Sequence, residues 1–353
     1  MAFITFNKVG IKAIAACVPK NISSNSDLTY FIPEEEVVKT INSIGIKEKR
    51  FADEQVTSSD LCYEAAEKLF TDNNIDRDTI DAVIFISQTP DYRQPATAPS
   101  LQSRLNLKKS TLSFDVNLAC SGYVYGLSIA FSFATQDGIS KVLLLVGETM
   151  SKTISKKDKI TTPLFGDAGT ATLIEKDDIF GTSCFSLNSD GSDAHILRVP
   201  YGGYRQPSSA EGFVEISDAE GNIRNGEQLQ MEGMDVFNFA LKAVPTDIKF
   251  ILQNCLLTIN DIDLMLFHQA NKFMTDFLAK RLKLDASKIP YSIEKFGNTS
   301  SASIPLTIVT ELNLPTNYPN RKTVMMSGFG AGLSWGTAIV SLENCYISQL
   351  TEY

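Results

Sequence analysis

An internal repeat constrains the fold of this chain more than any other feature of its sequence. An acidic turn, an apolar strand-like run and a glutamine follow one another around Asp81, and again around Asp263, 182 positions later. Repeats in one order and at nearly one spacing predict a duplicated core, although short apolar strands also match by chance. Two further pairs of segments repeat in the same order: 141–147 with 322–328, and 169–175 with 336–343.

Strand-like apolar runs alternate with helix-length segments throughout, which is typical of an α/β protein. We expect a first half at 1–176 and a second half at 231–353. The connection at 177–230 is rich in Gly, Ser, Pro and charge around 200–230, so we expect an excursion that covers a pocket.

Composition limits the classes of function. At 353 residues the chain is long for a single core of about 150 residues. A net charge of -9 argues against nucleic acid as the main partner, and no apolar run approaches the ~18 residues of a membrane-spanning helix. The six cysteines are scattered, so we expect reduced thiols and a cytoplasmic protein. The run 14–17 resembles a lipoprotein cleavage box, but it lacks a basic leader, so we expect a first strand at about 10–16.

Cys120 lies on a small-residue turn between a strand-like run and the almost wholly apolar segment 123–134. A thiol at the start of a buried helix has its thiolate stabilised by the helix dipole and by free amides. A free cysteine is more often an inert packing residue, and we expect that of the other five. Cys120 is therefore a candidate nucleophile, with a core thiol as the alternative.

Histidine occurs only at positions 195 and 268, which limits any imidazole chemistry to two choices. His268 ends an apolar strand, at the edge where open α/β sheets bind ligands, whereas His195 lies in a predicted surface turn. Asn298 lies in a second small-residue turn before a helix. Its side chain could donate to a substrate oxygen or could cap the helix, and the spacing favours neither.

The segment 327–336 has four glycines. Such a loop allows backbone amides to converge on an oxyanion, although glycines also serve ordinary turns.

Together these motifs resemble those of the beta-ketoacyl-acyl carrier protein synthase III family, within the thiolase superfamily. The resemblance covers nearly the whole chain and implies a thiolase-like duplicated five-layered α-β-α-β-α fold, which would explain the repeat. Six segments carry it in family order: 45–50 (Gly-Ile-Lys-Glu-Lys-Arg), 115–122 (Asp-Val-Asn-Leu-Ala-Cys-Ser-Gly), 165–169 (Phe-Gly-Asp-Ala-Gly), 268–271 (His-Gln-Ala-Asn), 297–303 (Gly-Asn-Thr-Ser-Ser-Ala-Ser) and 328–336 (Gly-Phe-Gly-Ala-Gly-Leu-Ser-Trp-Gly).

The resemblance implies a Cys-His-Asn centre. Cys120 would accept an acyl group from acyl-CoA, and His268 and Asn298 would hydrogen-bond the thioester carbonyl of malonyl-acyl carrier protein during a decarboxylative Claisen condensation. The enzyme would be a homodimer in fatty acid or related lipid or polyketide biosynthesis, and no metal or redox cofactor is required. The implied oxyanion-hole amides and substrate contacts are Cys120, Ala331, Asn271, Phe329 and Gly330.

Two related branches of the superfamily fit less well. Elongating synthases need two active-site histidines, and His195 lies in the wrong motif. Thiolases use a second cysteine in the late glycine-rich loop, and this loop has none.

Some positions depart from the family pattern. A Trp and an Arg that grip the CoA nucleotide in family members are replaced by Lys39 and Ser43, and a basic carrier-docking residue is replaced by Phe273. Ala98 stands where many relatives place an aromatic residue that lines the partner subunit's acyl pocket, so a longer or branched acyl group could fit. The remaining basic residues form either a carrier-docking patch or a solvated helix face: Lys272, Lys280, Arg281 and Lys283.

Three other functions remain as alternatives. A sister acyltransferase of specialised metabolism would share every catalytic motif. A thioester hydrolase or peptidase can also use Cys, His and Asn. A non-catalytic partner subunit would have little need of all three residue types.

Overall fold

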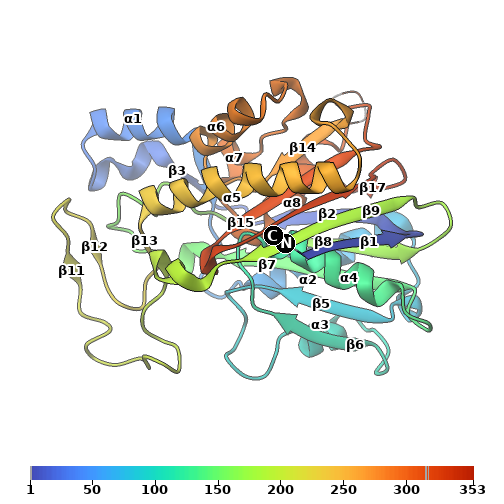
Figure 1. The fold of residues 1–353 in the computed structure, drawn as a ribbon. Coiled ribbons are helices and arrows are strands. Elements are labelled where there is room, and N and C mark those ends of the chain that lie inside the picture. Colours follow the sequence, from blue (N-terminus) through green and yellow to red (C-terminus); the bar gives the residue numbers. More distant parts are fainter. Residues whose placement is uncertain (1, 315, 317) are drawn as a thin grey trace.

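The chain folds around two large β-sheets, with helices between them and on both outer faces (Figure 1). The structure is a computed structural model that describes residues 2–314, 316 and 318–353. The first sheet has seven strands in the order β17-β2-β8-β7-β5-β6, and β18 also pairs with β2. Their bounds are Val9–Val18 (β2), Ala82–Ile86 (β5), Leu112–Val116 (β6), Lys141–Thr149 (β7), Asp167–Lys176 (β8), Tyr346–Ile347 (β17) and Thr351–Glu352 (β18).

The second sheet has five strands in the order β1-β9-β16-β15-β14. Their bounds are Ala2–Asn7 (β1), Thr182–Ser189 (β9), Leu264–Phe267 (β14), Val324–Gly330 (β15) and Ser334–Val340 (β16). In each sheet two parallel strands are followed by an antiparallel one, because β7 pairs with β5 and β8 as β15 pairs with β14 and β16.

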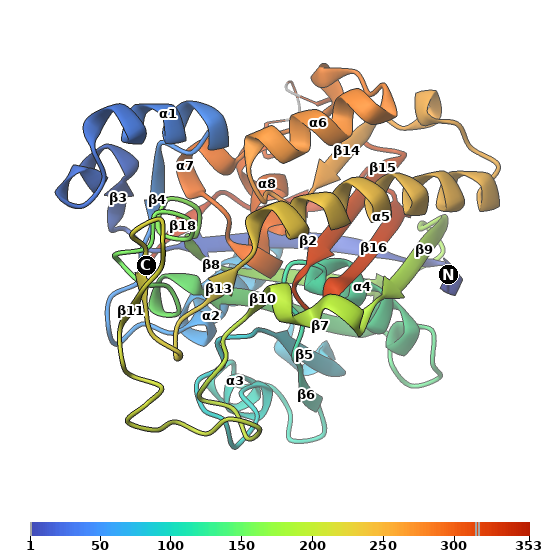
Figure 2. The same cartoon turned by 60° about the vertical axis from the view of Figure 1, so that its left-hand side comes forward.

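The helices form the other three layers, as Figure 2 shows most clearly. Between the sheets lie α4 (Gly122–Ala134) and α8 (Ser303–Glu311), whose side chains share one core cluster with strands of both sheets. Helix α4 is apolar on nearly all sides because both of its faces are buried. The predicted five-layered α/β fold is therefore confirmed. The outer helices are α2 (Ser58–Asn73) and α3 (Ala98–Arg104) on the first sheet, and α5 (Gly233–Asn254) and α6 (Lys272–Leu282) on the second.

The repeat around Asp81 and Asp263 is visible in the hydrogen bonds. The Asp81 carboxylate accepts the N–H groups of Ser140 and Lys141 at 2.7 and 3.0 Å. The Asp263 carboxylate accepts the N–H groups of Lys322 and Thr323 at 3.1 and 2.9 Å. These partners are also 182 positions apart, so both aspartates clamp the start of the next parallel strand.

The second predicted repeat, which matched 141–147 with 322–328, is one residue out of this register. Val142 pairs opposite β5 as Val324 pairs opposite β14, so Gly147 is not equivalent to Gly328. A side chain at Gly147 would meet α2 outside the first sheet, whereas one at Gly328 would meet α4 between the sheets. Because strand side chains alternate between faces, a shift of one residue reverses the face.

The halves exchange their outermost strands. Strand β1 pairs with β9 in the second sheet, whereas β17 and β18 pair with β2 in the first. The predicted first strand at 10–16 lies within β2. Strand β9 belongs to the core, so the part of 177–230 that leaves the core begins after Ser189.

The segment after Ser189 forms short strands and loops, and β11, β12 and β13 lie on the left of Figure 1, at one side of the two large sheets. The short strands are β10 (Leu197–Arg198), β11 (Ile216–Ser217), β12 (Ile223–Arg224) and β13 (Gln230–Met231).

All six cysteines are unpaired. Over the described ranges, no helix combines the length and the apolar character needed to cross a lipid bilayer.

Candidate active site

Cys120 lies two residues before the start of α4, on the turn that the sequence predicts, and the residue is 7% exposed. Burial raises the pKa of the thiol to about 11, although hydrogen bonds to Ser300 and to the backbone of Ala331 lower it. The Sγ atom lies 3.7 Å from the Ser300 Oγ atom. The resting group is therefore a neutral thiol in a nearly dry site.

His268 follows β14 directly and is buried. Its Nδ1 atom lies 2.7 Å from the Ser303 Oγ atom, which also accepts the N–H of Gln269 at 3.3 Å. That acceptor role leaves the Ser303 proton to donate to Nδ1, so we assign the imidazole proton to Nε2. Burial lowers the pKa of His268 to about 3. The ring is therefore a neutral hydrogen-bond donor.

Asn298 bridges the two halves. Its backbone N–H donates to the Leu164 carbonyl at 2.8 Å, and its carbonyl accepts from Gly166 N–H at 3.1 Å. Its Oδ1 atom accepts the N–H of Ser300 at 2.9 Å. The two roles suggested by the sequence are compatible, because the oxygen caps the turn while the amide N–H₂ group can donate to a substrate.

The glycine-rich loop lets the backbone approach the thiol. A Cβ atom at Gly330 would lie 2.6 Å from Cys120 Cβ and 2.8 Å from Cys120 Sγ. Such a contact is impossible without displacing the Cys120 side chain, so this position requires glycine. The next residue, Ala331, brings its amide within hydrogen-bonding reach of the Cys120 thiol.

The motif at 45–50 lies beneath the Asn298 turn. Lys49 is fully buried, and its Nζ atom donates to Asn25 Oδ1. A side chain at Gly297 would collide with Lys49 at 2.8 Å, and Gly297 has a φ of 64°. Burial lowers the pKa of Lys49 to about 8. Lys49 and Asn25 thus form the floor on which the turn rests.

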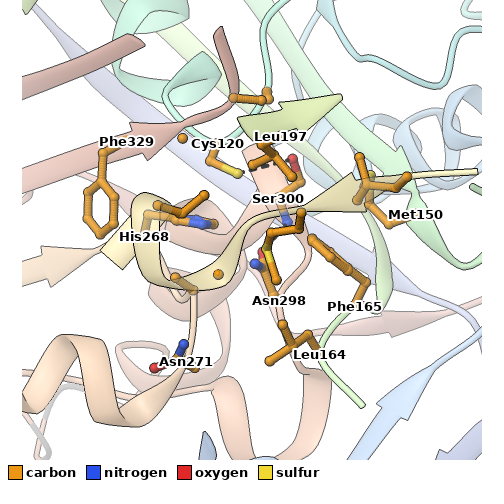
Figure 3. A pocket seen from close by; sticks show the side chains of 18 of the residues that line it. Cys120, Met150, Leu164, Phe165, Leu197, His268, Asn271, Asn298, Ser300 and Phe329 are labelled. Carbon is orange, nitrogen blue, oxygen red and sulfur yellow. Dashed lines mark hydrogen bonds between the residues drawn. The ribbon is translucent and has the colours of Figure 1, made fainter. Parts of the chain in front are cut away.

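One pocket brings Cys120, His268 and Asn298 together, as Figure 3 shows. Two residues of the predicted excursion, Leu197 and Leu229, line the pocket, as does Met231 directly after it. The sequence did not predict the apolar wall of the pocket or its two polar neighbours, although four of the lining residues lie inside the quoted motifs: Ala119, Phe165, Ala270 and Ser300. The unpredicted lining residues are Gln88, Ala119, Met150, Leu164, Phe165, Leu197, Leu229, Met231, Gly233, Val236, Ala270, Met274 and Ser300.

Comparison with known proteins decides the family. The model of 3-oxoacyl-[acyl-carrier-protein (ACP)] synthase III matches residues 114–191, and the model of its C-terminal part matches residues 252–342. A Campylobacter jejuni protein with the provisional name 3-oxoacyl-[acyl-carrier-protein] synthase 3 is 37% identical over 353 residues, covering 99% of this chain and 98% of the relative. The chain belongs to the 3-oxoacyl-[acyl-carrier-protein] synthase III family.

Solved structures agree with this assignment. A 3-oxoacyl-(acyl-carrier protein) synthase from Burkholderia xenovorans is 38% identical with a TM-score of 0.93, covering 100% of this chain and 99% of that one. A beta-ketoacyl-[acyl carrier protein] synthase III from Thermus thermophilus is 31% identical with a TM-score of 0.81, over 94% and 98% of the two chains. The protein is thus a condensing enzyme of the synthase III type.

The other predicted substrate residues of this synthase differ in their placement. Asn271, Phe329 and Gly330 line the pocket, and the Phe329 ring packs edge-on to His268 at 5.5 Å between centroids. Asn271 caps α6 through Met274 N–H. Ala98 is buried at the start of α3 and does not line this pocket within one chain, so its predicted role in a partner's pocket stays a prediction.

The predicted docking residues Lys272, Lys280 and Arg281 all lie on α6, beside the pocket. Lys272 pairs with Asp276, and Phe273 is 52% exposed. Their role in binding a carrier stays a prediction. Of the positions that depart from the family pattern, Lys39 and Ser43 are exposed on α1 (Glu34–Ile44), and His195 is exposed outside the pocket.

Proposed function

We propose that this synthase transfers an acyl group from acyl-CoA to Cys120 and then condenses it with malonyl-acyl carrier protein. One observation carries the proposal: a thiol from the first half and two neutral hydrogen-bond donors from the second line a single apolar pocket. The names of the relatives, which describe 3-oxoacyl-[acyl-carrier-protein] synthases, support the same reaction.

In the first step the Cys120 sulfur attacks the thioester carbonyl. The carbon–sulfur bond to CoA breaks, and the thiol proton leaves with CoA as free CoA thiol. Backbone amides of Cys120 and Ala331 stabilise the oxyanion. Because the pKa of the thiol is about 11, its proton has to leave as the new bond forms.

In the second step the malonyl group loses carbon dioxide, and its carbon–carbon bond electrons form an enolate. His268 Nε2–H and the Asn298 amide hydrogen-bond the enolate oxygen. The enolate carbon attacks the acyl-cysteine carbonyl and expels the Cys120 thiolate, which takes up one proton. The overall reaction consumes one proton and releases CoA and carbon dioxide.

The surroundings of the pocket suit these substrates. The apolar side chains of Met150, Leu164 and Phe165 would hold the acyl chain, and the basic residues of α6 would contact an acidic carrier. All reacting groups are side chains or backbone amides, so the proposed reaction needs no metal or redox cofactor. By family resemblance we also propose a cytoplasmic homodimer with Ala98 near the partner's pocket.

The proposal is tested by incubating the enzyme with an acyl-CoA panel and malonyl-acyl carrier protein. Mass spectrometry should detect an acyl group on Cys120 and a 3-oxoacyl group on the carrier. Free acid without a 3-oxoacyl product would indicate a thioester hydrolase. An acyl-enzyme that condenses only with a non-carrier acceptor would instead indicate a specialised acyltransferase, which the exposed Phe273 in place of a basic residue would explain.

A further inference from the structure

A buried carboxylate that the proposed reaction does not use lies behind the pocket. Glu148 is the penultimate residue of β7, and its side chain is fully buried. Burial raises its pKa to about 7. Across residues 2–314, 316 and 318–353, no cation lies within ion-pair distance of this carboxylate. Such a group costs stability unless hydrogen bonds compensate, so its presence calls for a function.

The hydrogen bonds of Glu148 join the two halves of the molecule. Its Oε1 atom accepts the Ser301 hydroxyl at 3.0 Å, which is a contact across 153 residues of sequence. Both carboxylate oxygens accept the N–H of Gln88, a pocket residue, and Oε2 also accepts the hydroxyls of Thr89 at 3.0 Å and Ser87 at 3.3 Å. Four groups therefore converge on one carboxylate.

Ser300, the neighbour of Ser301, lies among the three proposed catalytic residues in the pocket. Its N–H donates to the Asn298 side chain, its hydroxyl lies 3.7 Å from the Cys120 thiol, and its backbone lies close enough to raise the pKa of His268. Ser300 has a φ of 51°, in the left-handed region that a non-glycine residue adopts at a cost of about 1 kcal/mol or more. A strained residue persists only where its surroundings hold it.

We infer that Glu148 is a positioning residue: its bond to Ser301 holds Ser300 in the conformation that aligns Asn298 and His268 for the condensation step. This inference rests on the proposed function. The Glu148–Ser301 bond anchors the Asn298 turn of the second half to the rigid end of a central strand of the first. Asn298 lies on the same turn as the anchor, whereas Cys120 lies on a different segment and is also confined by the close approach of Gly330.

The geometry predicts a split between the two half-reactions. In Ser301→Ala the anchor is lost while the carboxylate remains, so condensation from pre-acylated enzyme should fall about 10- to 100-fold, as a small misplacement of catalytic groups does. Acylation of Cys120, followed by mass spectrometry, should change less than about threefold. Glu148→Gln should show the same split, because its amide N–H₂ group would face the N–H of Gln88 or a hydroxyl that donates to the carboxylate in the wild type. Acylation should not suffer, because removing a negative charge does not hinder loss of the Cys120 thiol proton.

Ser87→Ala is the matched control, because the Ser87 hydroxyl bonds the same carboxylate, whereas its other hydrogen bonds join Ser58 and Thr89 and not the Asn298 turn. It should keep condensation within about threefold of wild type. The double variant Glu148→Gln/Ser301→Ala should be no slower than the worse single variant, because both changes break one bond.

The outcomes separate this inference from the proposed function. Equal losses in acylation and condensation, an unaffected Ser301→Ala, or a Ser87→Ala loss as large as that of Ser301→Ala would each overturn the positioning role. A wild-type enzyme that forms no 3-oxoacyl product would overturn the proposed function, and the inference with it. If Glu148→Gln does not fold, as judged by circular dichroism, Ser301→Ala and Ser87→Ala still decide the question.

Discussion

The two halves of the synthase share a backbone plan but differ at the ends of their central strands. Asp81 and Asp263 clamp equivalent strands with the same pair of backbone hydrogen bonds. At the opposite end, β7 carries the buried carboxylate of Glu148, whereas β15 ends in the uncharged sequence Gly328-Phe329-Gly330. The strand ends far from the pocket stabilise the fold through these aspartates, whereas the strand ends at the pocket adjoin the proposed reacting groups.

The two halves therefore supply different kinds of chemical group to the pocket. The first half supplies the Cys120 thiol, which loses and regains a proton in the proposed reaction. The second half supplies neutral donors, because burial keeps His268 uncharged and Asn298 cannot ionise. In the proposed reaction, the duplicated fold thus places the nucleophile on one copy and the hydrogen-bond donors on the other.

The largest effect should come from removing one side of this division. Cys120→Ala should abolish the acyl-enzyme and lower 3-oxoacyl product by more than about 10⁴-fold, because no other group forms the covalent intermediate.

His268→Ala should lower product by about 10²- to 10³-fold, the usual cost of one oxyanion donor, yet keep most of the acylation of Cys120. Both half-reactions are followed by mass spectrometry. Equal loss of acylation in His268→Ala would contradict the division.

The pH dependence of Cys120 sharpens the same comparison. A thiol whose pKa is about 11 is mostly protonated below pH 10, so its alkylation by iodoacetamide should rise about tenfold per pH unit between pH 8 and 10. No inflection should occur near pH 6.5, because the lowered pKa of His268 keeps the ring neutral there. Cys120→Ala corrects for the other cysteines. A rate that levels off below pH 8 would show a low-pKa thiolate instead.

The glycine end of β15 gives a smaller effect. Gly330→Ala should lower Cys120 acylation by about 100-fold, because the new Cβ would displace the nucleophile by roughly an ångström. Gly181→Ala is the matched control, since its Cβ would meet no atom within 4 Å. Stopped-flow release of CoA measures both. Normal acylation in Gly330→Ala would mean that the loop moves aside.

The smallest effect should test the shared plan. Asp81→Ala and Asp263→Ala each leave two strand-start amides without their acceptor and should lower the free energy of unfolding by ~1–2 kcal/mol. Equivalent roles predict similar losses in urea denaturation, with catalysis retained at low temperature. A difference of more than about 1 kcal/mol between the variants would show that the two clamps are not equivalent in energy.

Most of this fold and the proposed reacting groups could be predicted from the sequence. Apolar periodicity and the Asp81 and Asp263 echo predicted the duplicated α/β core, and motif chemistry predicted Cys120, His268 and Asn298 at strand and helix ends. The predicted repeat of 141–147 with 322–328 is one residue out of register. It aligns glycines, which recur wherever backbones approach closely. Side-chain facing depends on pairing partners that a linear sequence does not specify.

The unpredicted residues have a common reason. Ser300 contacts Asn298 through its N–H and Cys120 through its hydroxyl while its backbone is left-handed, and a serine gives no sign of its φ angle in sequence. Glu148 follows an apolar run, where a carboxylate is expected to be solvated, and its burial results from contacts with Ser87 and Ser301 far along the chain. Long-range satisfaction of polar groups is a property of the assembled core.

The exchange of outer strands has a consequence for how the protein folds during synthesis. Strand β2 is made within the first twenty residues, but its parallel neighbours β17 and β18 emerge only at residues 346–352. Strand β1 in turn waits for β9, which emerges about 180 residues after it. Such distant pairings are slow to form because a long loop must close before any contact is gained. A nascent first half on the ribosome therefore exposes an open sheet edge for most of translation.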